Sequence, residues 1–118
     1  MRILTPYEKN FLTKNNFDLL SPALQTATQV EYLVGRAQFR GLNFFVDNST
    51  LIPRLETEQL VDLALENIFK NYSPNQKIII ADICTGSGCI GVSLALELIK
   101  KNQDFPLYFS DISKTALA

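Results

Sequence analysis

The sequence is 118 residues long, which is enough for one domain with a hydrophobic core and too short for two domains of ordinary size. Hydrophobic residues make up 47% and charged residues 19%, a balance that excludes a disordered chain and predicts a packed interior. The formal net charge is -1, so the chain lacks the basic surface that is typical of nucleic-acid-binding proteins, and we expect no direct nucleic-acid partner.

The N-terminus and the length of the apolar runs indicate the cellular compartment of the protein. No apolar run approaches the roughly 20 residues that span a bilayer, so we expect no membrane partner. The first residues, Met-Arg-Ile-Leu-Thr-Pro, contain no signal-peptide core. We therefore predict a cytoplasmic protein.

The first region, residues 1–35, has mixed polarity with two short apolar patches at 19–24 and 30–34. One or two short helices fit this pattern. Ser21 and Pro22 mark a helix start, because serine can cap free amides and proline tolerates the first helical position.

The second region, residues 36–55, predicts a β-hairpin followed by an extended linker. Within residues 38–47, Leu42, Phe44 and Val46 alternate with other residues and should share one face. The glycine before Leu42 marks the turn.

The third region begins with an amphipathic helix over residues 56–71. Glu56 and Glu58 fall in its first turn, where the positive end of the helix macrodipole favours acidic side chains. The apolar residues recur one helical turn apart, as expected for a stripe that packs against a core. They are Leu60, Val61, Ala64, Leu65, Ile68 and Phe69.

A strand, a glycine loop and a helix come next. Residues 77–83 are too short for a helix and rich in β-branched residues, which predicts a strand buried on both faces of a parallel sheet. Residues 84–88 contain two glycines. Residues 89–101 then predict a helix with Lys100 and Lys101 at its C-terminal end.

The last elements complete a β-α-β unit and indicate an α/β fold. Residues 105–110 predict a second strand that ends at Asp111. Ser113 follows as the expected cap of a further helix. The two cysteines, Cys84 and Cys89, are expected to be small buried residues, because two thiols without any histidine complete neither a disulfide framework nor a metal site.

A glycine turn after the first strand and an acid at the end of the second are typical of sites for nucleotides and nucleosides. Gly86 and Gly88 permit a close approach of a ligand to the main chain at the start of the helix, which a Cβ would block. Asp111 is placed to accept hydrogen bonds from both ribose hydroxyls. The alternatives are a tight turn without a ligand and a helix-capping acid.

Two classes of cofactor, dinucleotides and S-adenosylmethionine, are considered for this loop. Residues 86–91 satisfy G-x-G-x-x-G, so an enzyme that uses NAD or FAD is one interpretation. Asp82, four positions before Gly86, favours S-adenosylmethionine, because a carboxylate there can meet that cofactor's cationic amino group. The same carboxylate would repel a dinucleotide pyrophosphate. A loop-capping role is the alternative for Asp82.

Three segments resemble a known family. Residues 51–58, Leu-Ile-Pro-Arg-Leu-Glu-Thr-Glu, are close to the L-I-P-R-P-E-T-E signature of the release factor glutamine methyltransferases, the HemK or PrmC family. Residues 31–42 resemble its E-Y-L-x-G-x-x-x-F-x-G-L stretch, and residues 82–88 resemble its D-L-G-T-G-S-G loop. The resemblance runs from about residue 30 to residue 118.

The resemblance implies part of a class I, Rossmann-like methyltransferase fold that binds S-adenosyl-L-methionine. The implied activity is transfer of a methyl group to the side-chain amide of glutamine in the Gly-Gly-Gln loop of peptide chain release factors. It implies three parts: a remnant of an N-terminal helical domain (1–35), the β-hairpin and linker (36–55), and the first half of the cofactor-binding domain (56–118).

The resemblance also implies functional residues. Arg54, Glu56 and Thr57 are expected to border the substrate, with helix capping and surface pairing as the alternative. The implied cofactor-binding residues are Asp82, Cys84, Thr85, Gly86, Ser87, Gly88 and Asp111.

The sequence departs from the family pattern in three places. Leu55 replaces the second proline of the signature and Cys84 replaces the first loop glycine, and neither change excludes cofactor binding. The family's N-P-P-Y motif, which holds the substrate amide, is absent, so no catalytic residue is predicted and these 118 residues alone are expected to be inactive. An NAD-type oxidoreductase fragment and a non-catalytic ligand-binding adaptor are the alternative functions.

The truncated sheet predicted by the resemblance has one further consequence. Two parallel strands of a sheet that should have seven would leave one edge unpaired. We therefore expect weak stability or self-association of the chain.

Overall fold

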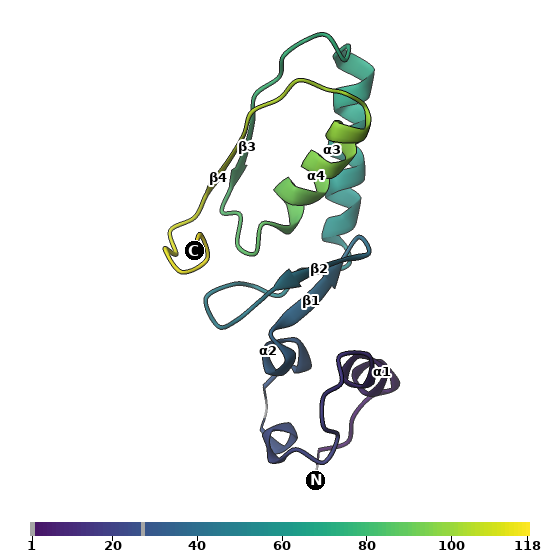
Figure 1. The fold of residues 1–118 in the computed structure, drawn as a ribbon, viewed down its shortest axis with the longest axis vertical. Helices are drawn as coiled ribbons and strands as arrows, with labels where there is room; N and C mark the ends of the chain where they lie inside the picture. Colours follow the sequence, from purple (N-terminus) through teal and green to yellow (C-terminus); the bar gives the residue numbers. More distant parts are fainter. Residues whose placement is uncertain (1, 27) are drawn as a thin grey trace.

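The computed structural model describes residues 2–26 and 28–118. The molecule is elongated, with extents of 56 × 29 × 20 Å. N-terminal helices, a β-hairpin and an α/β unit follow one another along its long axis (Figure 1).

The N-terminal part contains two α-helices and one 3-10 helix among the described residues: α1 (Pro6–Lys14), η1 (Pro22–Gln25) and α2 (Val30–Val34). The prediction of a helix start at Ser21 is confirmed, because its hydroxyl accepts a hydrogen bond from the amide of Ala23. These elements enclose a small apolar cluster. Its buried members are Phe11, Leu12, Leu24 and Val30.

The hairpin pairs β1 (Arg36–Phe39) with β2 (Leu42–Phe45) in antiparallel register. The predicted alternation is confirmed, since Phe44 and Val46 are buried and Leu42 packs partly buried against the core. The hairpin therefore presents one apolar face to the rest of the molecule, as the period of two requires.

The turn of the hairpin is fixed to the next helix, α3 (Thr57–Asn71). The backbone amide of Arg40, at a positive φ of 49°, donates to Glu58 Oε1 at 2.7 Å. The Arg40 guanidinium also pairs with Asp62 on the same helix. Because Glu58 satisfies an amide that the turn leaves unpaired, α3 positions the hairpin.

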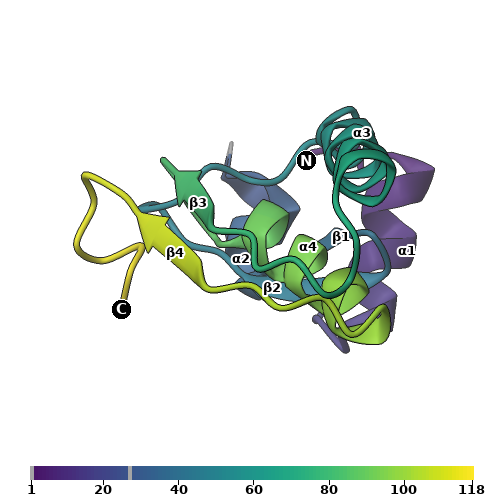
Figure 2. The same cartoon turned by 90° about the horizontal axis from the view of Figure 1, so that it is seen from above.

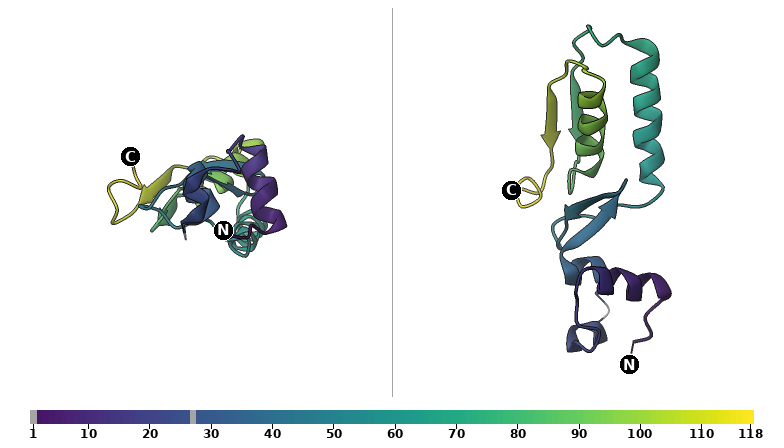
Figure 3. Two further views of the ribbon diagram at one scale, coloured as in Figure 1. Left: turned by 90° about the horizontal axis from the view of Figure 1, so that it is seen from below. Right: turned by 45° about the vertical axis from the view of Figure 1, so that its right-hand side comes forward.

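Helix α3 packs beside α4 (Cys89–Lys100), and both predicted helices are confirmed. Figure 3 shows the two helices on the same side of the strands. The main core forms between these helices and the hairpin. Its buried residues are Phe39, Phe44, Val61, Leu65, Cys89, Leu94 and Leu98.

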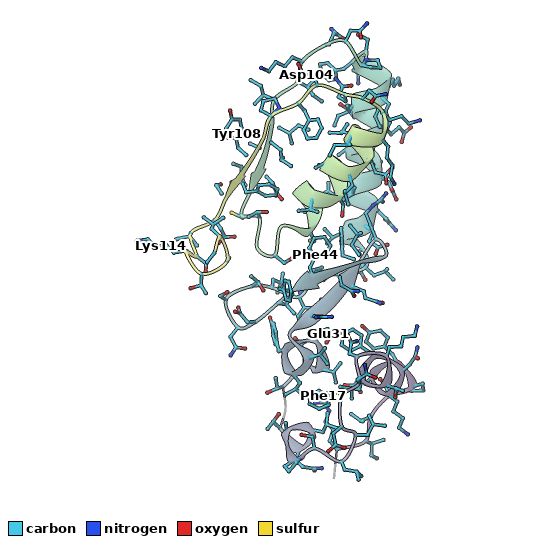
Figure 4. All side chains as sticks on the ribbon, in the orientation of Figure 1. Phe17, Glu31, Phe44, Asp104, Tyr108 and Lys114 are labelled. Carbon is cyan, nitrogen blue, oxygen red and sulfur yellow. The ribbon has the colours of Figure 1, made fainter. Side chains whose placement is uncertain are left out.

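The strands β3 (Ile80–Ile83) and β4 (Leu107–Ser110) pair in parallel, as predicted. The expectation that β3 is buried on both faces is wrong. Ile79 and Ile83 are 74% and 67% exposed, and Tyr108 on β4 is 61% exposed. Because α3 and α4 cover the same face, the other face is bare (Figures 2 and 3). Figure 4 shows the Tyr108 side chain projecting from the sheet away from α4.

The loops at the end of the sheet farthest from the hairpin are joined by one side chain. Gln103, buried in the loop before β4, donates from Nε2 to the carbonyl oxygens of Ser73 and Gln76. These two carbonyls belong to the loop between α3 and β3. The buried amide thus links the two loops, and its N–H donors are satisfied by these two carbonyls.

The segment after β4 differs from the prediction of a helix. The Ser113 hydroxyl accepts from the Ala116 amide, as a helix cap would, but residues 114–117 form only a turn. Forming the first helical turn fixes several backbone angles in return for few hydrogen bonds. A single turn is therefore unstable as a helix unless other parts of the protein pack against it.

Candidate functional site

The glycine loop lies where β3 ends and α4 begins (Figure 1). Its main chain turns through the left-handed region at Cys84 (φ 60°), Gly86 (φ 56°) and Gly88 (φ 80°). Glycine takes these angles without strain, whereas Cys84 carries a Cβ at a cost of about 1–2 kcal/mol. Cys84 thus occupies a conformation suited to the glycine that it replaces.

The two cysteines have different environments. Cys89 is buried in the core as expected, and burial is the main reason that the pKa of its thiol is raised. The expectation of burial is wrong for Cys84, which is exposed. The bend of the loop turns its side chain out of the packed interior, which its place after a strand predicted to be buried did not indicate.

Asp82, on β3, holds the glycine loop through hydrogen bonds to its residues and to the start of α4. Its Oδ2 accepts hydrogen bonds from Thr85 Oγ1 at 2.7 Å and from the Gly91 amide at 2.9 Å. Since Gly88 is the N-cap residue of α4 and has no side chain to cap it, the carboxylate on β3 performs that role. Asp82 is only 8% exposed, so this oxygen is committed to the loop.

Gly91 allows α4 to lie close to the sheet. A Cβ added to this residue would come within 2.4 Å of Phe109 Cε1 and 2.9 Å of Asp82 Oδ2. No ordinary side chain contact is that short, so only glycine fits at this position. The third glycine of the motif therefore has a packing role.

Asp111 holds the other side of the loop. Its Oδ2 accepts from the Gly86 amide at 2.8 Å and its Oδ1 accepts from the Ser113 amide at 2.9 Å. Hydrogen bonds from the amides of Ser113 and Gly86 lower the pKa of this carboxyl group. The ionised carboxylate has further lone pairs, so these two contacts leave capacity for additional donors.

A cavity of about 240 Å³ lies between this loop and the segment before α3. It brings Arg54 and Thr57 next to Cys84, Thr85, Gly86 and Ser87. Glu56 and Gly88 are not among its lining residues. The remaining lining residues are Leu51, Ile52, Pro53, Cys89 and Ile90.

A second cavity of about 550 Å³ lies between the hairpin and the C-terminal turn, and it shares Ser87 with the first. The family resemblance implies that the hairpin borders the active site, although it assigns no individual residue of this wall to the site. The lining residues from the hairpin and the turn after it are Asn43, Phe44, Phe45, Val46, Asp47, Ser49 and Thr50.

Residues 2–26 and 28–118 contain no cluster of three or more histidine, cysteine or acidic side chains that could hold a metal ion. None of the helices within these ranges combines the length and the apolar character needed to cross a bilayer.

Comparison with known proteins gives a consistent result. The chain is 44% identical over 88 residues to the release factor glutamine methyltransferase of Bacillus subtilis (strain 168), covering 75% of this chain and 29% of that protein. The enzyme of the same name from Flavobacterium psychrophilum is 43% identical over 96 residues, which is 80% of this chain and 32% of the relative. The Lactococcus lactis enzyme is 40% identical over 114 residues, 97% of this chain and 37% of the relative.

These matches extend through the glycine loop and place the chain among the relatives of methyltransferases. More particularly, we assign it to the release factor glutamine methyltransferase family, which confirms the resemblance found in the sequence. No family model matches the chain. The chain spans about a third of the length of the relatives named above.

Proposed function

We propose that this chain contributes the S-adenosyl-L-methionine site of a cytoplasmic protein methyltransferase. The proposed acceptor is the side-chain amide of glutamine in the Gly-Gly-Gln loop of peptide chain release factors. The observation that carries this proposal is the sequence identity of 40–44% to three enzymes of that name, over an aligned region that contains the glycine loop.

The loop fits an adenosyl cofactor in three respects. A Cβ placed on Gly86 would meet no other atom within 4 Å, so open space lies beside the main chain at the point where a ligand must approach closely. The two cavities that meet at Ser87 add room on either side of that residue. Asp111, at the end of β4, supplies a charged acceptor for ribose hydroxyls.

In this proposal the chain binds and orients the cofactor, which would supply a methyl group carried on a sulfonium. Asp82 and Asp111 hold the loop in one conformation before the ligand arrives, so little ordering is needed on binding. Leu51 and Ile52 give the cavity an apolar wall on one side. Asn-Pro-Pro-Tyr does not occur in the sequence, so we propose that these 118 residues bind cofactor without transferring methyl.

Calorimetric titration of the chain with S-adenosylhomocysteine and, separately, with NADH tests the cofactor. We expect binding of the first and none of the second. The variant Asp111→Ala should weaken S-adenosylhomocysteine binding at least about tenfold, because it removes charge-assisted hydrogen bonds. Asp104→Ala, an exposed acid at the opposite end of β4, is the matched control. Binding of NADH alone would support the oxidoreductase interpretation and overturn the proposal.

A methylation assay with a release factor as acceptor tests the expected inactivity. Transfer of label from S-adenosylmethionine to the glutamine by the chain alone would contradict it. Transfer that depends on a longer protein containing these residues would support the proposed activity.

A further inference from the structure

Arg54 is the only charged residue among the described residues that line the cavity beside the glycine loop. It lies in the extended segment before α3, and its guanidinium makes neither an ion pair nor a hydrogen bond with the residues that the structure describes. Neither Asp82 nor Asp111 lines this cavity. The charge that a ligand would meet there is therefore positive.

The start of α4 adds to this positive potential. Cys89 and Ile90 line the same cavity, and within the described chain their amides donate to no backbone carbonyl and no carboxylate, only toward the Cys89 sulfur. The next amide, of Gly91, already donates to Asp82. The first amides of a helix attract negative groups, because they are unpaired and carry the positive end of the macrodipole.

The start of α3 is different. The amide of Thr57 donates to the carbonyl of Arg54, and the amide of Glu58 donates to the carbonyl of Leu55. These donors are already satisfied, so α3 contributes no free amides here. The Arg54 side chain is thus the charged group on that wall, among the described residues, that remains available to an anion.

We propose that Arg54 binds the carboxylate at the amino-acid end of the cofactor. This inference rests on the proposed function and assigns one end of the same site. S-adenosylmethionine carries a single anionic group, its carboxylate, and this cavity presents a single cation facing the loop. A guanidinium donates two parallel hydrogen bonds to a carboxylate, which makes it better suited to the task than a lysine.

Arg54 is then a cofactor-binding residue, whereas the family resemblance implied that it borders the substrate. The assignment also places the amino-acid end between the signature segment and the loop, in a cavity that Asp111 does not line. The adenosine would then extend toward Asp111, which directly follows β4.

Two ligands that differ only in the carboxylate test the proposal. S-adenosylmethionine and its decarboxylated form share the adenosine, the sulfonium and the amine. Their affinities would be measured by calorimetry for the unaltered chain, for Arg54→Gln and for Arg54→Lys. Arg36→Gln is the matched control, because this change removes the same charge from a residue that lines neither cavity.

We expect the unaltered chain and the Arg36→Gln chain to prefer S-adenosylmethionine by about tenfold, a ratio typical of a charge-assisted pair. Arg54→Gln should lose this preference without weaker binding of the decarboxylated form, and Arg54→Lys should keep part of it. A preference that survives in Arg54→Gln, or an equal loss for both ligands, overturns the inference and leaves the proposed function intact. Absence of binding of either ligand to the folded, unaltered chain overturns both.

Salt provides a second measurement that needs no variant. Raising the ionic strength screens the pair at this exposed guanidinium, so the preference of the unaltered chain for S-adenosylmethionine should shrink. A preference that does not change with salt would contradict the role of Arg54.

Discussion

The carboxylate of Asp82 and the backbone amide of Gly91 are joined at 2.9 Å, which links strand β3 directly to the first turn of helix α4. The same oxygen accepts from the Thr85 hydroxyl. One buried carboxylate therefore caps a helix that its own N-cap glycine leaves uncapped, and it also fixes the loop that connects them. A charge-assisted hydrogen bond thus joins the strand to the first turn of the helix.

Asp82→Asn should lower the free energy of unfolding by about 1–3 kcal/mol, because it replaces a charged acceptor with a neutral one at a buried cap. Urea denaturation measures the difference. Asp104→Asn, at an exposed position, should change the free energy of unfolding by less than about 0.5 kcal/mol. Equal effects of the two substitutions would show that the cap contributes nothing.

Gly91→Ala should lower the free energy of unfolding by about 1–3 kcal/mol, because the added Cβ would overlap Phe109 and the Asp82 carboxylate. Thermal and urea unfolding measure the loss. Phe109→Leu introduced into the same chain should recover part of it, since it removes the atom that lies 2.4 Å from the new Cβ. A double variant that is no more stable than Gly91→Ala would contradict the overlap.

Much of this arrangement could be predicted from the sequence. The stripe of apolar residues in α3, the β-branched run of β3 and the alternation in the hairpin each predicted the element that the structure contains. Helix α1 was not predicted as such, although Thr5, Pro6 and Glu8 form a capping box with proline in the first turn. Its apolar positions are few, so periodicity alone did not reveal it.

The site could be predicted less completely, because its key contacts join residues that are distant in the sequence. Gly86, Gly88 and Asp111 were predicted from their pattern along the sequence, and Cys84, Thr85 and Ser87 from the family resemblance. The bond from the Gly86 amide to Asp111 depends on the parallel register of β3 and β4, which no local pattern specifies. The bare face of the sheet was also missed, because an apolar run does not tell how many helices cover each side.

The two thiols should react at very different rates. In the native chain, one thiol equivalent is expected to react rapidly with Ellman's reagent, since Cys84 is exposed while Cys89 is buried and has a pKa raised by that burial. The second equivalent should react only in denaturant. Cys84→Ala should abolish the rapid phase. Two rapid equivalents in the native chain would show that the core around Cys89 opens readily.

The Asp111 anchor should depend on pH. Its folded-state pKa is lowered by the amides of Ser113 and Gly86, so its contribution to stability is complete above the ordinary aspartate pKa of about 4. That contribution is lost as the pH falls through the lowered pKa. The difference in free energy of unfolding between the unaltered chain and Asp111→Asn should therefore be constant near neutral pH and shrink in acid. A gap that persists at strongly acidic pH would contradict this.

The bare sheet face should promote self-association. Ile79 is 74% exposed beside the unpaired edge of β3, where its side chain and the free backbone groups can meet another strand. Light scattering should show a mass that rises with concentration, and Ile79→Lys should reduce this rise. Leu63→Lys, at a similarly exposed position on α3, is the control and should not. A monomer at every concentration would disprove the expectation.

The tie formed by Gln103 has a consequence for sequence variation. Its side-chain amide contacts the main-chain carbonyls of Ser73 and Gln76 and no side chain of that loop. Evolution is therefore free to exchange residues 73–76 as long as the course of the loop is kept, while position 103 needs a long primary amide. We therefore expect residues 73–76 to vary among homologous sequences while position 103 remains glutamine.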